Sequence, residues 1–369
     1  MGGLFFEHMT RRLGREPVHP QKTLETEVTT MAKVICMFNH KGGVSKTTTS
    51  YGLAWMLTNK GKRVILVDAD SQCNLTNIAL GEEEFEKFSI EYPERNLKEA
   101  LSPAFDAKPV MLDAVECVEI RDNEDLLLVP GSFDLSEYEV SLGVSFTLSD
   151  TMATLKNLPG SFAFLINRTA EKYDADYVII DMNPSLSAIN EALLVSADFF
   201  IVPIAPDNFS AMAIRSLSKI LPKWEQWAIR ARDVFASAVY PLPLNTPKFL
   251  GTVVQRFNIR KGKPTKANRE VIERLSKTVQ TTFIDALRSV DMALSDDAYI
   301  AEDYCLALIP DFQSLNAAYQ THGVPVFELS DEQLGAVGTV LGNYQQMREK
   351  FEKLFSEFAD LVISMTADE

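Results

Sequence analysis

The stretch Met37–Ser50, MFNHKGGVSKTTTS, carries the residue types that bind phosphate groups. In the common phosphate-binding loop a glycine and four further residues precede Gly-Lys-Ser/Thr, so that backbone N–H groups and the lysine hold the phosphates. Lys46 and Thr47 match that pattern, whereas His40 and Ser45 stand at the two glycine positions. We expect Lys46 to reach the β- and γ-phosphates of a nucleotide and Thr47 to help hold Mg²⁺.

Carboxylates follow two apolar runs downstream of this loop. Asp68 and Asp70 end RVILVDAD, and Asp181 ends YVIIDM. Because the carboxyl ends of parallel strands share one edge of a sheet, we expect all three beside the phosphate loop, with Asp181 as the acid that supports Mg²⁺. The structural alternative is a tight strand-to-helix turn in which the three acids only cap strand ends.

Short apolar runs alternate with helical stretches along the chain. This order predicts an α/β fold, a doubly wound and mostly parallel sheet flanked by helices, with functional loops at the carboxyl ends of the strands. The predicted strands are 33–38, 63–70, 125–130, 177–182, 199–204, 249–257 and 304–310. The phosphate loop leads from the first of them into a helix over 47–62.

The chain is predicted to hold one folded domain. Residues 1–30 mix charges with prolines and show no apolar periodicity, which predicts a flexible N-terminal extension. Residues 31–369 form the domain. Within it, the acidic segment 81–120 is predicted to be a surface insertion and 331–369 a C-terminal helical region.

Composition favours a cytoplasmic location. The four cysteines form no C-x-x-C pair, and no run of eighteen apolar residues occurs, so neither a disulfide framework nor a membrane span is expected. The net charge of −15 argues against a protein that coats nucleic acid, but leaves room for a local basic face.

Three stretches resemble, in order and spacing, the ParA/Soj/MinD family of deviant Walker ATPases: KGGVSKTTTS, VILVDADSQCNLT and YDADYVIIDMNPSLSAINEALLVSADFFIVPI. The first motif of that family opens with a signature lysine, and Lys41 stands there. The second motif and the Walker B motif are matched by Asp68, Asp70, Gln72 and Asn74, and by Asp181, Asn183, Pro184 and Ser185. The resemblance covers most of residues 31–330 and implies a P-loop NTPase architecture.

The resemblance implies an ATP-dependent homodimer that holds two ATP molecules between its subunits. Lys41 would reach the phosphates of the partner, Asp70 would orient the attacking water, and Asp68 would join Asp181 in supporting Mg²⁺ through water. Lys41, Lys46 and Asp70 are thereby implied as catalytic. The implied ATP contacts are Lys41, Gly42, Gly43, Val44, Ser45, Lys46, Thr47, Thr48, Gln255, Arg256 and Pro310.

Ser45 departs from the family pattern, which has glycine at this position. If its backbone is helical, serine fits the loop. If its φ is positive, the side chain costs roughly 1 kcal/mol or more. We expect nucleotide binding to survive and hydrolysis to be slowed.

A basic segment points to nucleic acid. Between Ala211 and Glu270 twelve Lys or Arg residues stand against three acids, a net charge of +9. Such a segment suits sequence-independent contact with DNA phosphates. The predicted DNA contacts are Arg256, Arg260, Lys261, Lys263 and Lys266. Against this, Asp311 and Gln313 stand where the family carries arginines used for DNA.

The sequence thus predicts a cytoplasmic, nucleoid-associated ATPase that binds nonspecific DNA and positions plasmid, chromosome or protein cargo. A ParB-like or other activating partner would stimulate its hydrolysis. The alternative is a nucleotide-dependent regulatory switch that recruits a protein effector without DNA. Membrane binding is not expected, because the final helix carries acids where a membrane-surface helix carries Lys or Arg.

Overall fold

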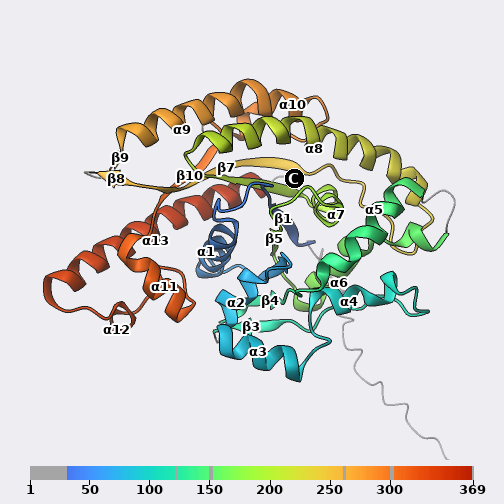
Figure 1. The fold of residues 1–369 in the computed structure, drawn as a ribbon, viewed down its shortest axis with the longest axis horizontal. Coiled ribbons are helices and arrows are strands. Elements are labelled where there is room, and N and C mark those ends of the chain that lie inside the picture. The colour runs from blue at the N-terminus through green and yellow to red at the C-terminus, as the bar shows by residue number, and fades with distance from the viewer. Residues whose placement is uncertain (1–30, 122, 149–152, 261–262, 300–302, 368–369) are drawn as a thin grey trace, which may run out of the picture. The chain divides into compact units, whose positions relative to one another are not determined.

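An eight-stranded sheet forms the centre of the unit Met31–Glu369 (Figure 1). The computed structural model describes residues 31–121, 123–148, 153–260, 263–299 and 303–367. The prediction for residues 1–30 lies outside them. In spatial order the strands are β10 (Cys305–Pro310), β7 (Lys248–Phe257), β6 (Phe199–Ile204), β1 (Lys33–Met37), β5 (Tyr177–Met182), β2 (Val64–Ala69), β4 (Asn123–Val129) and β3 (Val118–Ile120). In this described sheet β3 runs antiparallel to β4, and the other pairings are parallel.

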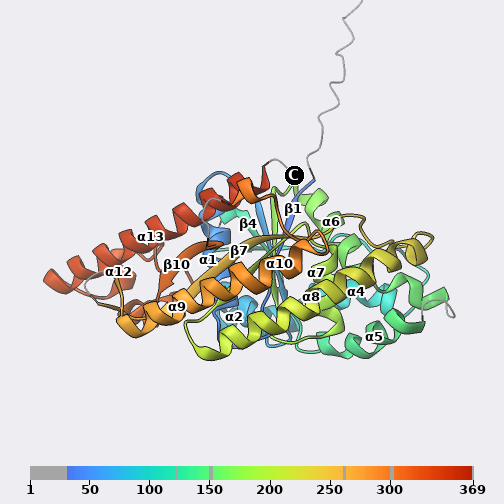
Figure 2. The same cartoon turned by 90° about the horizontal axis from the view of Figure 1, so that it is seen from above.

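Helices cover both faces of the sheet, each over its own apolar core. One face carries α1 (Lys46–Asn59), α2 (Asn74–Leu80), α11 (Asn316–His322), α12 (Asp331–Leu334) and α13 (Gly338–Thr366). The other carries α4 (Leu97–Phe105), α5 (Tyr138–Leu148), α6 (Ser161–Tyr173), α7 (Ala188–Ser196), α8 (Asn208–Phe235), α9 (Lys266–Thr278) and α10 (Ile284–Arg288), with α9 and α10 joined by a π-helical turn at Val279–Phe283. Figure 2 shows α8 alongside α9 and α10. The predicted doubly wound α/β fold is confirmed.

The strands are continuous apolar runs because both faces of the sheet are covered. Every residue of β5 and β6 is buried, and both strands have the predicted bounds. On β1 successive side chains alternate between the two cores, Ile35 and Met37 entering one and Val34 and Cys36 the other.

The prediction of a surface insertion over 81–120 is wrong for its second half. Helix α3 (Glu82–Glu91) buries no residue, but Leu97 and Leu101 of α4 are buried in the core, and β3 is an edge strand of the sheet. The i, i+4 spacing of the two leucines places them on one face of α4, and the glutamates upstream obscured this signal.

The C-terminal helix α13 packs on α1. Phe355, Phe358 and Val362 are buried in the core that α1 also enters. A Cβ at Gly52 of α1 would stand 2.4 Å from the ring of Phe355, so glycine is what permits this close approach. Among the described residues, no helix is long and apolar enough to cross a membrane.

Candidate nucleotide-binding site

The loop between β1 and α1 curves over the N-terminus of α1. Gly43 and Ser45 both have positive φ, 71° and 60°, and α1 begins at Lys46. A helix N-terminus directs unpaired N–H groups and the positive end of its dipole outward. Phosphate is the ligand that this arrangement suits.

A cavity of about 800 Å³ opens in front of this loop. Asp70, Gln255 and Pro310 reach it from the ends of β2, β7 and β10. The sequence-predicted residues that line it are Gly43, Val44, Ser45, Lys46, Thr47, Thr48, Asp70, Gln255, Arg256 and Pro310. Lys41, Gly42, Asp68 and Asp181 are not among its lining residues. The fold therefore brings the predicted phosphate and base contacts together.

Lys46 is the buried cation of the loop. Its side chain is almost fully buried, and its Nζ donates to the Asn39 carbonyl at 3.2 Å. Burial lowers the Lys46 pKa, while the nearby carboxylates of Asp181 and Asp70 oppose that shift. A buried ammonium with one carbonyl partner retains N–H donors for a phosphate oxygen.

Asp181 fits the acid that supports a hydrated Mg²⁺. It is paired in register with Asp68 on β2 and is 1% exposed. Its Oδ1 accepts from Ser50 Oγ at 3.4 Å, whereas its Oδ2 is buried without a partner. Burial, and then the charge of Asp68, raise the Asp181 pKa to about 7, and the Thr47 hydroxyl counteracts this. An unsatisfied buried carboxylate oxygen beside a hydroxyl suits a metal-bound water.

Asp68 was expected to support Mg²⁺, but both of its carboxylate oxygens accept hydrogen bonds within the protein. Its Oδ2 accepts from Thr76 N at 2.8 Å and from Thr76 Oγ1 at 2.6 Å, and its Oδ1 accepts from Asp70 N at 3.3 Å. Asp68 thereby holds the start of α2 and the loop that carries Asp70. Its role toward Mg²⁺ stays a prediction.

Lys41 points away from the cavity of its own chain. Its Nζ forms an ion pair with Asp207 and a 3.1 Å hydrogen bond to Ser210 Oγ. Burial raises the Asp207 pKa, but hydrogen bonds from Lys41 and from Ser210 N outweigh it and leave the pKa below its usual value. The N-terminus of α8 therefore binds Lys41, which the family resemblance assigns to the ATP phosphates of a partner subunit.

Gln255 contacts the first turn of α1, and Arg256 contacts the phosphate loop. Gln255 Nε2 donates to Thr49 Oγ1, and Arg256 Nη1 donates to the Gly43 carbonyl at 3.1 Å. Arg256 itself has a φ of 60°. Its guanidinium thus lies at the phosphate loop, near the cavity where the implied ATP contact placed it, and its DNA contact stays a prediction.

Sequence reasoning missed several polar residues around the cavity. Their positions come from turns and helices that carry no motif, so only the topology brings them here. The lining residues concerned are Asn77, Glu82, Arg121, Asn316, Tyr319 and Gln320. Asp207 was missed too, although an aspartate immediately before a helical stretch signals a helix start. Its side chain accepts from Ser210 N at 2.8 Å.

The backbone of Ser45 decides the question left open by the sequence, because a φ of 60° is the costly case. The strain belongs to the folded backbone, so its relief acts on stability rather than on ATP affinity. We expect Ser45→Gly to raise the melting temperature, with a gain of about 1 kcal/mol in the free energy of unfolding, and to change ATP affinity by less than about twofold. Ser45→Ala is the control, since it keeps the Cβ and removes the hydroxyl. Thermal unfolding and calorimetric titration with ATP measure the two effects. A lower melting temperature of Ser45→Gly would contradict the strain argument, and weaker ATP binding by both variants would assign the hydroxyl a phosphate contact.

Fold and site together define a P-loop nucleotide-binding protein of the α/β class. The AAA domain family matches residues 32–229, more than half of the chain. The sporulation initiation inhibitor protein Soj of Bacillus subtilis is 31% identical over 191 residues, 52% of this chain and 64% of Soj. The chain therefore spans less than two thirds of the length of this relative.

Solved structures share the fold at low sequence identity. McdA of Cyanothece in complex with ATP superposes with a TM-score of 0.56 at 17% identity, over 88% of this chain and 96% of McdA. pNOB8 ParA bound to nonspecific DNA gives 0.54 at 19% identity, over 92% of this chain and 100% of that protein. The chain belongs to the AAA domain family and to the ParA family.

Proposed function

We propose that the protein is an ATP-dependent dimerising ATPase that binds DNA nonspecifically and positions a cargo, with hydrolysis stimulated by a partner protein. The proposal rests on one combination of features. The chain has a phosphate site around Lys46, while the signature lysine, Lys41, does not line that site and pairs with Asp207. Lys46 and the α1 N-terminus neutralise the phosphates, and Thr47 with Asp181 supports Mg²⁺. Bound Mg²⁺ supplies charge neutralisation to the transferring phosphoryl group.

Within one site, Asp70 is the residue suited to the attacking water. It lines the cavity, and its Oδ1 accepts from Gln72 N at 3.0 Å, which orients the carboxylate. Asp68 positions it by accepting a hydrogen bond from Asp70 N at 3.3 Å. Lys41, once released from Asp207, would deliver a second cation to the phosphates of the facing subunit, where a developing negative charge needs it.

Exposed apolar side chains at this edge of the sheet support a dimer. Phe209 and Met212, at the start of α8, are 70% and 64% exposed, and Leu186, on the loop after β5, is 45% exposed. Phe209 is two residues from Asp207 in the sequence, so exposed apolar surface lies on the helix turn that binds Lys41. A facing copy of the chain would bury these side chains.

A basic surface on α8 and α9 supports DNA binding. On α8 the exposed residues recur at helical spacing, and α9 lies alongside (Figure 2). The exposed basic residues are Arg215, Lys219, Lys223, Arg230, Lys266, Arg269, Arg274 and Lys277. Evenly spaced cations along two adjacent helices suit a phosphate backbone.

Not every Lys or Arg counted between Ala211 and Glu270 belongs to this surface. Arg232 is buried with Glu225 at 2.9 Å, Lys248 pairs with Asp291 at 3.0 Å, and Arg256 lies at the phosphate loop. Lys261 lies outside the described residues, and the side chains of Arg260 and Lys263 are not described.

Salt-dependent DNA retention tests the proposal. With ATP we expect binding to a random duplex at about 50 mM salt, falling about 100-fold by about 200 mM if four phosphates are contacted. The double variant Lys219→Glu with Lys223→Glu is expected to lose tenfold or more. Arg168→Glu with Lys353→Glu changes net charge equally at exposed positions elsewhere and serves as the control. No ATP-dependent binding at low salt would favour the regulatory switch that recruits an effector without DNA.

A further inference from the structure

Arg121 stands in a strained turn beside the nucleotide cavity. It follows Ile120, the last residue of β3, and Ile120 pairs with Asn123 at the start of β4, so the connection is a tight hairpin turn. The φ of Arg121 is 53°, a conformation that such turns require and that Asn or Gly adopts more readily than Arg. Arg121 also lines the cavity. Backbone strain that is retained at a cavity indicates that the side chain has a function there.

The guanidinium of Arg121 lies between the ends of two helices that wall the cavity. A Cβ added at Gly323, after α11, would overlap Arg121 Nη2 and would stand 2.5 Å from the Ile78 carbonyl oxygen of α2. A Cβ at Gly81, after α2, would stand 3.9 Å from the same Nη2. Glycine at both helix ends therefore lets α2, α11 and the guanidinium approach one another. The last carbonyls of a helix lack partners within it, and a guanidinium is a suitable donor to them.

Tyr51 of α1 belongs to the same contact. Its side chain is fully buried, and its Oη donates to the Gly323 carbonyl at 2.7 Å. Burial raises the pKa of Tyr51 to about 12, and the neighbouring side chains of Trp55 and Arg121 oppose that shift. Arg121 and Tyr51 together therefore hold the ends of α2 and α11 against α1.

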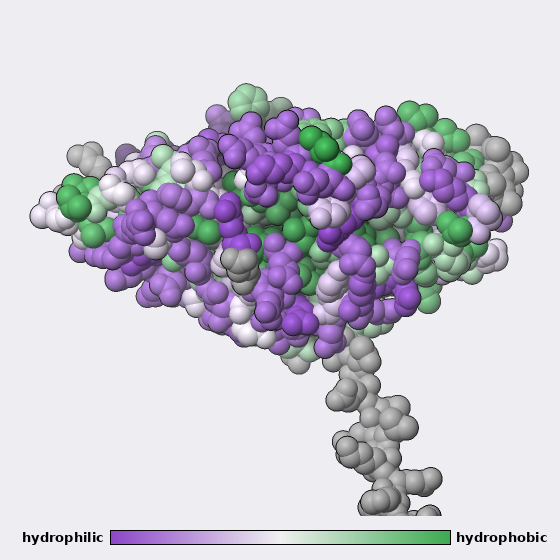
Figure 3. Space-filling model, turned by 90° about the horizontal axis from the view of Figure 1, so that it is seen from below, coloured by the Kyte–Doolittle hydropathy of each residue, from purple (hydrophilic) through white to green (hydrophobic). Residues whose placement is uncertain are grey.

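The guanidinium makes these contacts at a hydrophilic side of the molecule. The lower side of Figure 1, where α2, α3 and β3 lie, is seen in Figure 3, and hydrophilic residues dominate it. Arg121 is exposed, so it keeps part of its surface in water while its tip lies between the helices.

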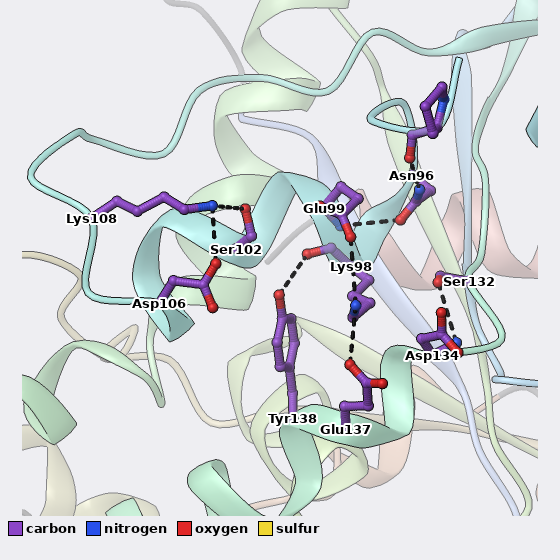
Figure 4. Close-up of polar contacts among 11 residues, drawn as sticks. Asn96, Lys98, Glu99, Ser102, Asp106, Lys108, Ser132, Asp134, Glu137 and Tyr138 are labelled. Carbon is purple, nitrogen blue, oxygen red and sulfur yellow. Dashed lines mark hydrogen bonds and ion pairs between the residues drawn. The ribbon is translucent and has the colours of Figure 1, made fainter. Parts of the chain in front are cut away.

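The start of α2 has a different support. Thr76 Oγ1 accepts from Gly131 N, on the loop after β4, at 2.9 Å. That loop is fastened to α4 in Figure 4, where Lys98 Nζ pairs with Glu137 at 3.1 Å and Tyr138 Oη donates to the Lys98 carbonyl at 3.2 Å. The start of α2 therefore rests on a fixed loop, and the guanidinium acts at the other end of the helix.

The orientation of α2 affects the position of Asp70. The Asp70 carbonyl accepts from Cys73 N at 2.9 Å, and α2 begins at the next residue, Asn74. Asp70 and Asn74 both line the cavity. A helix of seven residues is short and stiff, so a displacement of its end also reorients its start and the loop before it.

We propose that Arg121 is a positioning residue of the nucleotide site, which clamps the end of α2 to α11 and α1 and thereby holds Asp70 in place at the cavity. This inference deepens the proposed function and rests on it only for the role of Asp70 in hydrolysis. The clamp itself requires neither hydrolysis nor a partner.

Hydrogen exchange of the nucleotide-free full chain, measured by mass spectrometry, tests the clamp. Arg121→Asn removes the guanidinium but suits a φ of 53°, so the melting temperature is expected to stay equal or to rise. The amides of α2 are expected to exchange about tenfold faster, whereas those of α7 change less than about twofold. Tyr51→Phe is expected to have the same local effect. The double variant is expected to exceed either single variant by less than about twofold, because both side chains belong to one contact.

A matched arginine elsewhere serves as the control for the exchange experiment. Arg63 precedes β2 and pairs with Asp125 at 3.1 Å, and Arg63→Asn is expected to leave the exchange of α2 unchanged. Unchanged exchange of α2 in Arg121→Asn would overturn the clamp. So would an equal effect of the control, or faster exchange throughout the chain together with a lower melting temperature.

Turnover distinguishes positioning from direct contact with ATP. Arg121→Asn is expected to lower kcat about tenfold and to change KM for ATP less than about twofold, because the phosphate loop stays intact. A raised KM with an unchanged kcat would mean that Arg121 binds ATP itself and would overturn the positioning role. If the exchange of α2 increases but the wild type does not hydrolyse ATP, the proposed function fails and the clamp stands.

Discussion

Replacing Lys41 by alanine is expected to reduce ATP turnover about 10²–10³-fold while ATP affinity changes less than about threefold. The reason is geometric, because Lys41 leaves its own cavity and pairs with Asp207, whereas Lys46 holds the phosphates from within. Stopped-flow binding of a fluorescent ATP analogue and a phosphate-release assay measure the two effects. Turnover at the wild-type rate would contradict the assignment of Lys41.

A mixing experiment tests whether Lys41 acts across a dimer. Chains carrying Lys41→Ala and chains carrying Lys46→Ala are each expected to be inactive. Mixed, they form hybrids in which one intact site receives the lysine of the other chain, and up to about a quarter of wild-type turnover is expected to return. No recovery on mixing would mean that Lys41 acts within its own chain and would exclude the trans role.

Asp207→Asn is the matched control for the ion pair. It retains the helix-capping oxygen for Ser210 N but removes the charge that holds Lys41. The carboxylate is partly exposed, so the pair contributes little stability. Turnover is expected to stay equal or to rise severalfold, the opposite of Lys41→Ala. A large loss of turnover would mean that Asp207 has a catalytic role of its own.

The fold and the phosphate site were predictable because their signals are local. A strand buried on both faces is a continuous apolar run, and β5 and β6 have the predicted bounds. The residues at the ends of such strands share one edge of the sheet, so Asp68, Asp70 and Asp181 could be placed beside the phosphate loop without coordinates.

Contacts between distant positions carry no such signal. Lys41 and Asp207 are 166 residues apart, and neither the spacing nor the residue types indicate their pairing. Arg121 reaches the cavity from the turn between β3 and β4, and the sequence prediction had no strand at β3. The φ of Ser45 was equally hidden, because a serine in a glycine-rich loop can adopt either conformation.

Asp181→Asn is expected to stabilise the nucleotide-free protein at pH 8 by about 1–3 kcal/mol and to abolish hydrolysis. The folded pKa of Asp181, about 7, exceeds the value of about 3.9 for an unfolded aspartate. The folded state therefore binds the extra proton between these values, and the stability it provides is full below about pH 4 and lost as the pH rises through about 7. Asparagine does not titrate.

Urea unfolding at pH 5 and pH 8 without metal measures this difference. Stability of the wild type is expected to fall relative to Asp181→Asn as the pH rises, so the gap is smaller at pH 5 than at pH 8. Asp68, Asp70 and Lys46 face Asp181 in the wild type and face the asparagine in the variant. The exposed Asp233→Asn on α8 is the control for removing a carboxylate from the surface. A gap of the same size at both pH values would mean that altered packing, rather than the buried charge, separates the two proteins. A gap confined to high pH would identify Asp181 as an acid whose burial destabilises the fold, which is the expected cost of keeping a carboxylate ready for Mg²⁺.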